Sequence, residues 1–181
     1  LDSHKKLVDL KKLDDEFQLD IRYASTNNFM RSKFYKNEKA FFNMSAADRL
    51  IEAKNDLKEL GYGIIIYDAY RPWFVTKMFW EGTPENLKHF VANPENGSSH
   101  NKGCAIDIGL YDIETGESIV MISGYDEFTE RAYPNYMGGS KKQRDIRDML
   151  IQVMERNDFT VYEYEWWHFN YNGCDLSLIH I

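Results

Sequence analysis

One segment of the sequence, residues 98–107, carries a histidine and an aspartate at a spacing that suits a metal site. If a strand begins at about residue 104, alternation puts Cys104 on the core side and Asp107 on the other side, where small neighbours leave room for an ion. Gly103 can bend the preceding loop and bring the imidazole of His100 back towards Asp107. A histidine that caps a turn and an aspartate in a surface ion pair would explain the same residues, so this segment alone leaves both interpretations open.

A second segment, residues 163–169, places Glu165 and His168 among aromatic residues. A histidine in an aromatic strand is more often packed in the core than bound to a ligand. Residues three apart point to opposite faces of a regular strand. Both therefore reach one site only if Glu165 lies in the approach to the strand or at an irregularity, with His168 on the strand itself.

Two of these histidines and the aspartate would make a catalytic metal site. His100, Asp107 and His168 offer two nitrogen atoms and one oxygen atom and leave a fourth position open, which is typical of catalytic zinc. Glu165 would then take a proton from the attacking water and pass it to a leaving amine. A structural zinc site would have four protein ligands and no use for this acid. Cys104 is interpreted as a core residue, because it shares its side of the strand with isoleucines.

A third segment joins the end of a predicted strand to a helix that starts at Pro72. An exposed arginine at such a turn is common and needs no function. In the functional interpretation, Asp68 orients Arg71, whose fixed fork of donors can stabilise an oxyanion or hold a carboxylate.

The elements that must position these side chains follow from apolar periodicity and from helix caps. Strands are predicted at 18–24, 62–68, 104–111, 118–122, 159–163 and 165–171. Helices are predicted from Ser45, with Asp48 completing a capping box, to Gly61, from Pro72 to about Trp80, and from about Ser140 to Arg156. Short strands in mixed order with helices predict a single α+β domain rather than a βαβ repeat.

Composition limits the classes of function. The chain has 181 residues, 43% of them hydrophobic, which is ample for the core of one domain. A net charge of −7 without a basic cluster argues against nucleic acid or an anionic membrane as the main partner. No apolar run approaches the roughly 20 residues of a membrane span. The two cysteines, Cys104 and Cys174, form no CxxC pair and neither require nor exclude an oxidising compartment.

The three segments together resemble the D-alanyl-D-alanine dipeptidases of the VanX type, within the zinc-dependent DD- and LD-peptidases of the peptidase M15 family. The SxHxxGxAxD and ExxH motifs of that group are matched by Ser98, His100, Gly103, Ala105, Asp107, Glu165 and His168. The dipeptidase branch is favoured by the segments 20–29, 68–72, 124–132 and 165–169. The resemblance spans roughly residues 7–173.

The resemblance implies roles for individual residues. His100, Asp107 and His168 would bind one zinc ion. Glu165 would be the general base and acid, and Arg71 would stabilise the tetrahedral transition state.

It also implies how a small dipeptide is held. Asp126 and Tyr23 would hold the amino group of the substrate, Ser98 would help to seat the dipeptide, and Asp68 would contribute through Arg71. The implied fold is the hedgehog/DD-peptidase-like α+β fold, in which a central antiparallel sheet carries the metal. The expected partner is D-Ala-D-Ala, and the oligomeric state is left open.

Two other functions stay open at this stage. A D,D-carboxypeptidase or an L,D-endopeptidase acting on peptidoglycan stem peptides would use the same metal site in a more open groove. A zinc-binding or cell-wall-binding module without catalysis would need no general base.

The ends of the sequence carry separate expectations. Residues 1–175 are expected to form the domain and residues 176–181 a non-native tail, because Leu-Ser-Leu-Ile-His-Ile is what a common sequencing adaptor would encode. A cytoplasmic location is expected, with the cell envelope as the alternative if a signal peptide preceded Leu1.

Overall fold

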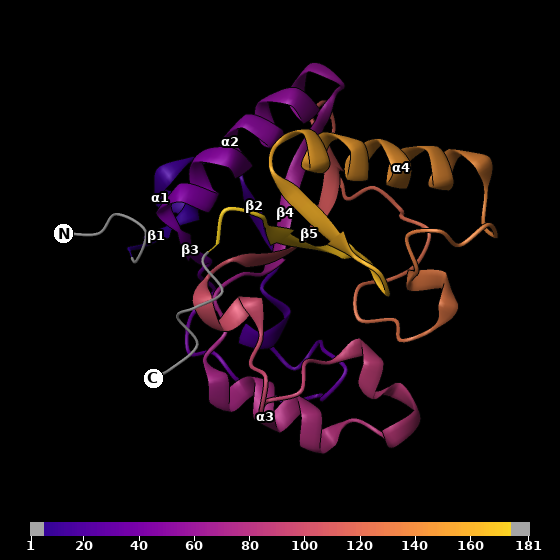
Figure 1. Cartoon of the computed structure of the whole chain (residues 1–181). Helices are drawn as coiled ribbons and strands as arrows, with labels where there is room; N and C mark the ends of the chain where they lie inside the picture. The colour runs from indigo at the N-terminus through magenta and orange to yellow at the C-terminus, as the bar shows by residue number, and fades with distance from the viewer. Residues whose placement is uncertain (1–5, 175–181) are drawn as a thin grey trace.

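A five-stranded sheet forms the centre of the computed structural model, which describes residues 6–174 (Figure 1). The strand order is β2 (Gln18–Leu19), β4 (Tyr62–Asp68), β5 (Ala105–Asp112), β7 (Glu165–Tyr171) and β6 (Phe159–Tyr162). The last four strands are antiparallel, whereas the short β2 joins β4 in parallel. The prediction of a single α+β domain is confirmed. The sheet was expected to be antiparallel, but it is mixed because the edge strand β2 pairs with β4 in parallel.

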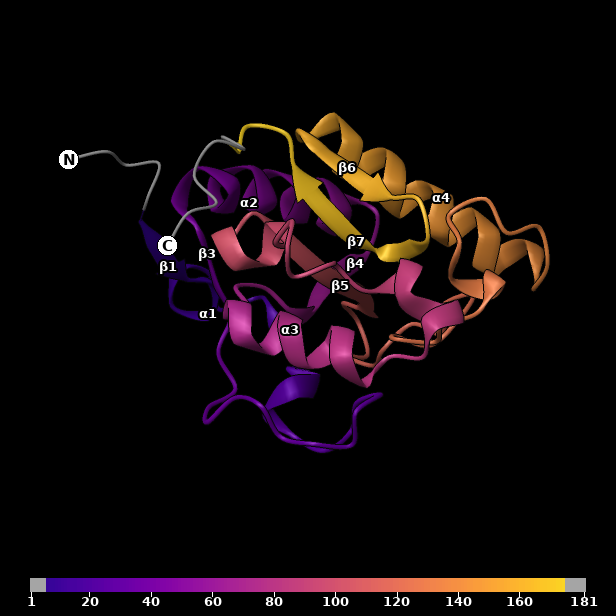
Figure 2. The same ribbon diagram turned by 60° about the horizontal axis from the view of Figure 1, so that its bottom comes forward.

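Helices cover both sides of this sheet (Figures 1 and 2). The two long helices, α2 (Met44–Glu59) and α4 (Lys141–Arg156), pack on one side, and α3 (Trp73–Gly82) lies on the other. The remaining elements are β1 (Leu7–Asp9), α1 (Leu10–Leu13), β3 (Phe41–Asn43) and the 3-10 helices η2 (Arg22–Ala24), η3 (Glu85–Phe90), η4 (Ser99–Lys102) and η5 (Glu130–Ala132). The strands β1 and β3 form a separate antiparallel pair.

The helix caps explain where the long helices begin. The helix α4 begins after Ser140, close to its predicted start, and Ser140 caps it in a capping box with Gln143. The predicted start of α2 at Ser45 is wrong, because Asn43 is the cap and its side chain accepts a hydrogen bond from the backbone N–H of Ser45 (3.0 Å). The helix ends as predicted before Gly61, whose φ of 90° suits glycine alone.

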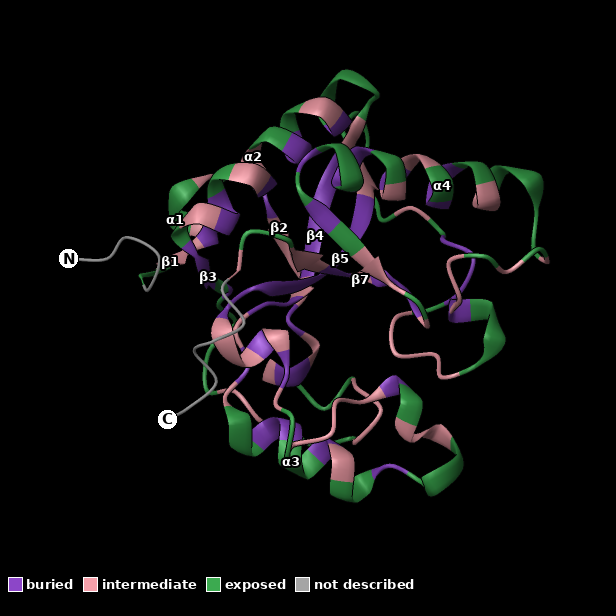
Figure 3. Ribbon diagram, viewed as in Figure 1, coloured by how far each residue is buried: buried purple, intermediate pink, exposed green. Residues whose placement is uncertain are grey.

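The alternation along β5 separates the core from the functional side. Ile106, Ile108 and Leu110 belong to the main hydrophobic core. Asp107 is also buried, but it faces the opposite side of the sheet and lines a pocket. The strand is buried over most of its length, as its purple colour in Figure 3 shows. A carboxylate is thus held on a rigid, enclosed strand.

Two of the predicted strands are wrong. The segment 18–24 pairs only at Gln18–Leu19 and then turns into η2, where Tyr23 is buried away from the sheet. The segment 118–122 makes only an isolated bridge between Ser118 and Tyr111. In both segments the apolar residues are packed without pairing in a β-sheet. The prediction is wrong because β-branched and aromatic residues are typical of buried positions in general as well as of strands.

A disulfide joins Cys104, just before β5, to Cys174, just after β7, with 6.1 Å between the Cα atoms. The interpretation of Cys104 as a core residue is confirmed, since it is 1% exposed, although its pairing was not predicted. Within residues 6–174, no helix combines the length and apolar character needed to cross a membrane. The proposed tail 176–181 lies outside the described residues, so the domain limits stay a prediction.

Candidate active site

The loop before β5 turns His100 towards the sheet. The Ser98 hydroxyl caps η4 by accepting a hydrogen bond from the backbone N–H of His100 (3.2 Å). Gly103 ends η4 with a left-handed φ of 67°, so the chain bends as the sequence predicts. The buried ring returns to β5, where Nε2 of His100 lies 3.3 Å from Oδ1 of Asp107. Its Nδ1 lies 2.7 Å from the Ala69 carbonyl oxygen, which accepts the ring proton and leaves a lone pair on Nε2.

The hairpin of β6 and β7 brings Glu165 and His168 to the same site. Their pairing carries a register shift opposite Glu165, which is the first residue of β7, so the predicted irregularity is confirmed. Oε2 of Glu165 lies 3.7 Å from Nδ1 of His168. The same Nδ1 is 3.1 Å from Oδ1 of Asp107. The other ring nitrogen of His168 lies 2.9 Å from Oδ1 of Asn170, which assigns the proton to Nε2 and the lone pair to Nδ1.

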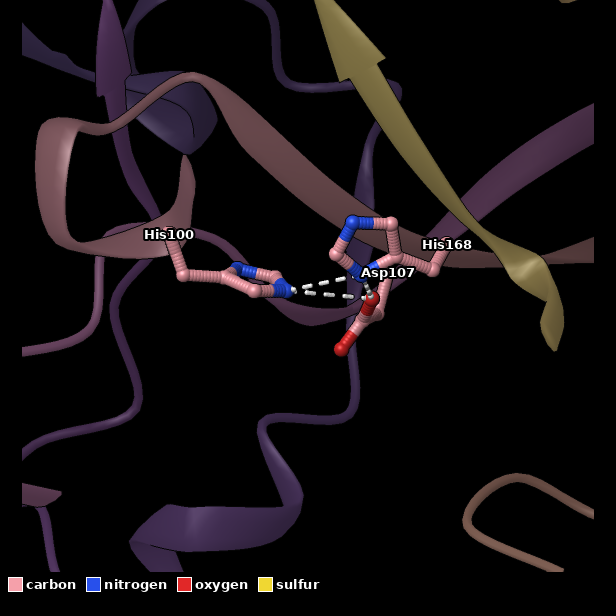
Figure 4. A group of neighbouring side chains, drawn as sticks. All are labelled: His100, Asp107 and His168. Carbon is pink, nitrogen blue, oxygen red and sulfur yellow. Dashed lines mark hydrogen bonds and ion pairs between the residues drawn. The ribbon is translucent and has the colours of Figure 1, made fainter. Parts of the chain in front are cut away.

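Three lone pairs therefore converge on one point (Figure 4). The two facing imidazole nitrogens of His100 and His168 are 3.2 Å apart. Asp107 Oδ1 is buried and has no hydrogen-bond partner among the described residues. Tetrahedral zinc with bonds of about 2.0 Å separates its ligand atoms by roughly 3.3 Å, which matches this triangle. The donor types and their spacing thus fit a zinc ion.

The charge state of the three groups is also suited to a cation. Burial lowers the pKa of His100, which favours the neutral imidazole that a metal requires. Burial opposes ionisation of Asp107, but the neighbouring His100 and His168 outweigh it and lower the pKa of this carboxyl. Burial raises the pKa of Glu165 well above its ordinary value, and the carboxylates of Asp107 and Asp126 add to the rise.

Arg71 reaches the pocket from the turn between β4 and α3. Its Nε donates to Oδ2 of Asp68 (2.9 Å), and its Nη2 lies 3.7 Å from Oδ2 of Asp107. The hydroxyl of Tyr35 donates to the other oxygen of Asp68 (2.9 Å). Asp68 is therefore held from both sides and fixes the guanidinium group in one orientation. Tyr35 was missed in the sequence, because nothing near it in the chain marks it as a site residue.

Asp126 and Tyr23 form the far end of the pocket. The Tyr23 hydroxyl donates to Oδ2 of Asp126 (2.5 Å). The backbone of Asp126 has a φ of 57°, a left-handed conformation that aspartate and asparagine tolerate better than most residues. Burial raises the pKa of Asp126 to about 7. A cationic ligand group placed here would be paired with a carboxylate that is only partly exposed to water.

Aromatic rings enclose this end of the pocket. Phe79 lies with its ring centroid 4.7 Å from that of Tyr23 and 5.0 Å from that of Phe29. Phe128 continues the wall, with its centroid 4.9 Å from Phe29 and 4.9 Å from Phe90. All five rings line the same pocket. Sequence reasoning did not single out Phe79, Phe90 or Phe128, which look like ordinary core residues in the chain.

Every predicted site residue except Asp68 lines this one pocket of about 210 Å³. They are Tyr23, Arg71, Ser98, His100, Asp107, Asp126, Glu165 and His168. Asp68 is predicted to orient Arg71 and to contribute to substrate binding through it; it is 1% exposed and accepts a hydrogen bond from Nε of Arg71. It positions Arg71 and does not face the pocket.

Comparison with known proteins identifies the family of the chain. Residues 3–177 match the peptidase M15 family described as D-Ala-D-Ala dipeptidase. A D-alanyl-D-alanine dipeptidase of Enterococcus faecium is 32% identical over 171 residues, which cover 83% of this chain and 83% of that protein. The D-alanyl-D-alanine dipeptidase of Escherichia coli is 29% identical over 164 residues, 91% of this chain and 83% of that protein.

Among solved structures, a vancomycin-resistance D,D-dipeptidase in complex with a D-Ala-D-Ala phosphinate analogue matches 93% of this chain and 68% of its own, at 22% identity and a TM-score of 0.42. The family match covers nearly the whole chain, including every residue of the pocket. The chain therefore belongs to the D-Ala-D-Ala dipeptidase family of the M15 peptidases.

Proposed function

We propose that this chain is a zinc-dependent dipeptidase that hydrolyses D-Ala-D-Ala to two molecules of D-alanine. The observation that carries the proposal is the triangle of two imidazole nitrogens and one carboxylate oxygen beside Glu165 and Arg71, in one small pocket. His100, Asp107 and His168 would hold one zinc ion. Bound there, the ion would polarise the scissile carbonyl and activate the attacking water.

Glu165 is the proton carrier in this proposal. Glu165 is 6% exposed, and its carboxylate lies next to the proposed metal-binding triangle, 3.7 Å from Nδ1 of His168. It accepts a proton from the attacking water, holds it in the enclosed pocket and returns it to the nitrogen of the departing D-alanine. The register shift that begins β7 supports this role, because it puts acid and ligand on the same side of the sheet.

Arg71 stabilises the negative charge that develops on the substrate carbonyl oxygen. The bond from Nε to Asp68 fixes the guanidinium group at the wall of the pocket, where Nη2 lies 3.7 Å from Oδ2 of Asp107. A donor whose orientation is set in advance stabilises a developing oxyanion without reorganisation during the reaction.

The two ends of the pocket suit the two charged ends of a free dipeptide. Asp126 and Tyr23 bind the ammonium group, next to the aromatic rings that line the same pocket. Ser98 lines the pocket beside His100, and its hydroxyl, which accepts a hydrogen bond from the backbone N–H of His100, would donate its proton to the substrate carboxylate. The volume of about 210 Å³ is below the ~300–1,000 Å³ of pockets that take drug-sized ligands, which supports a very small substrate.

A panel of three peptides tests the proposed function. D-Ala-D-Ala should be hydrolysed, and a zinc chelator should abolish the release of D-alanine. L-Ala-L-Ala and N-acetyl-D-Ala-D-Ala should be poor substrates, the latter because its amino end carries no charge for Asp126. Rapid hydrolysis of the acetylated peptide would indicate a D,D-carboxypeptidase instead, and equal rates on the two free dipeptides would contradict stereospecificity.

A conservative change at Arg71 tests its part in catalysis. Arg71→Lys keeps the charge but cannot donate to Asp68 and to the substrate in the same planar arrangement. We expect kcat for D-Ala-D-Ala to fall about 10²-fold, the lower end for loss of one oriented donor, with KM changed much less. The matched control is Arg156→Lys on the exposed end of α4, which should keep full activity. A loss confined to KM would assign Arg71 to binding alone.

A further inference from the structure

The two oxygens of Asp107 have different partners. Oδ1 faces the imidazole nitrogens of His100 and His168 and has no hydrogen bond among the described residues. Oδ2 accepts a hydrogen bond from the hydroxyl of Tyr125 (2.8 Å), and the nearest cationic atom, Nη2 of Arg71, is 3.7 Å away. The hydroxyl of Tyr125 is thus the closest partner that sets the rotation of this carboxylate.

The ring of Tyr125 is held rigidly enough to impose that rotation. It stacks on Tyr67, with the centroids 4.6 Å apart and the planes 23° apart, and meets Trp167 edge to face at 5.5 Å. Gly109 of β5 makes room for this stack, because a Cβ at that position would collide with the ring of Tyr67. The hydroxyl therefore comes from a packed layer and not from a mobile side chain.

Among residues 6–174, two oxygen atoms lie within hydrogen-bond distance of the Tyr125 hydroxyl, and Oδ2 of Asp107 is the better acceptor. The hydroxyl oxygen of Tyr23 lies 3.4 Å from that of Tyr125. The Tyr23 hydroxyl donates its own proton to Oδ2 of Asp126. A carboxylate at 2.8 Å is a shorter and stronger acceptor than a hydroxyl at 3.4 Å. The proton of Tyr125 therefore points to Oδ2 of Asp107.

We propose that Tyr125 is a positioning residue for the metal site, whose hydroxyl keeps Oδ1 of Asp107 turned towards the two imidazoles and so raises the affinity for zinc. Without this bond the carboxylate is free to rotate out of the triangle. Partners of this kind behind a metal ligand commonly change metal affinity by 10- to 100-fold. The inference rests on the proposed zinc site, but not on the identity of the substrate.

Tyr125→Phe tests the proposal, since it removes one oxygen atom and keeps the ring. Zinc affinity is measured by competition with a chromophoric chelator, on protein freed of metal and then titrated with zinc alone. We expect Tyr125→Phe to bind zinc about 10- to 100-fold more weakly than the unaltered protein. Hydrolysis lost at limiting zinc should return at high zinc concentration, which a general loss of folding would not allow.

Tyr67→Phe is the matched control, because it removes a hydroxyl from the neighbouring ring of the same stack. It should bind zinc as tightly as the unaltered protein, and the metal-free forms of both variants should melt within a few degrees of it. Unchanged zinc affinity in Tyr125→Phe, or an equal loss in both variants, would overturn the role of the hydroxyl. Failure of the unaltered protein to bind zinc would instead overturn the proposed function, and the positioning role with it.

Discussion

Glu165→Gln is expected to lower kcat for D-Ala-D-Ala by about 10²- to 10⁴-fold while zinc stays bound. Glutamine has nearly the same shape but can neither take a proton from water nor return one to the leaving amine. Steady-state release of D-alanine, measured together with the zinc content of the purified variant, checks both parts of the prediction. The three proposed ligand side chains are untouched by this change.

Glu163→Gln provides the control for this experiment. Glu163 is exposed, lies two residues before Glu165 in the same hairpin and does not line the pocket. The control variant therefore has the same glutamate-to-glutamine substitution outside the proposed site. It should retain full turnover. If Glu165→Gln hydrolysed the dipeptide at the original rate, another group would have to be the base, and loss of zinc from this variant would make Glu165 part of the metal site.

Asp126→Asn is expected to reduce kcat/KM by roughly 30- to 4,000-fold, mainly through a higher KM. Removing one partner of a buried, hydrogen-bonded charge pair costs about 2–5 kcal/mol of binding free energy. Here the substitution removes the carboxylate that is proposed to bind the substrate ammonium group. Asparagine tolerates the left-handed backbone at this position, so the turn should survive. Steady-state kinetics with D-Ala-D-Ala and a melting curve separate binding from folding.

The pH dependence of the same residue gives a second measurement. Because burial raises the pKa of Asp126 to about 7, the carboxylate forms only as the pH rises through that value. Binding of the ammonium group, and hence kcat/KM, should increase over this range, and Asp126→Asn should lose that dependence. The groups that act on Asp126 are the Tyr23 hydroxyl, the carboxylates of Asp107 and Asp68, and the Arg71 guanidinium.

The stability of the protein should change in the opposite direction with pH. An acid whose pKa is raised by folding stabilises the folded state below its unfolded pKa, and this contribution is lost as the pH rises through the folded pKa. The free energy of unfolding contributed by Asp126 should therefore decrease towards neutral pH. Glu130→Gln, an exposed acid in the same loop region, should alter neither the kinetic nor the stability profile. An unchanged pH profile in Asp126→Asn would contradict the assignment.

Elements with a strict period were predictable from the sequence. The alternation of isoleucines with small residues in β5 and the capped apolar stripe of α4 each indicate a single local structure. The prediction of a strand at 18–24 is wrong because Tyr23 is buried by contacts with aromatic rings far along the chain, such as Phe79, and not by a neighbouring strand. Burial that arises from tertiary packing looks the same in a local pattern as burial in a sheet.

The proximity of His100, Asp107 and His168 could be predicted because chemistry restricts the residue types that suit a metal site. Histidine beside aspartate and glutamate at defined spacing is a rare combination, so it stands out. The residues behind the triangle could not be foreseen. Tyr35 and Tyr125 act through single hydroxyl groups, and only the folded chain shows that these reach Asp68 and Asp107.

The disulfide between Cys104 and Cys174 has a consequence for the protein once its chain has been cut. The bond closes a covalent loop that contains the strands carrying Asp107 and His168. A protease that cleaves once in the exposed turn after β5 would leave two fragments that still form one molecule. The cut protein should run as a single band on a denaturing gel until a reducing agent is added, and only then separate into two.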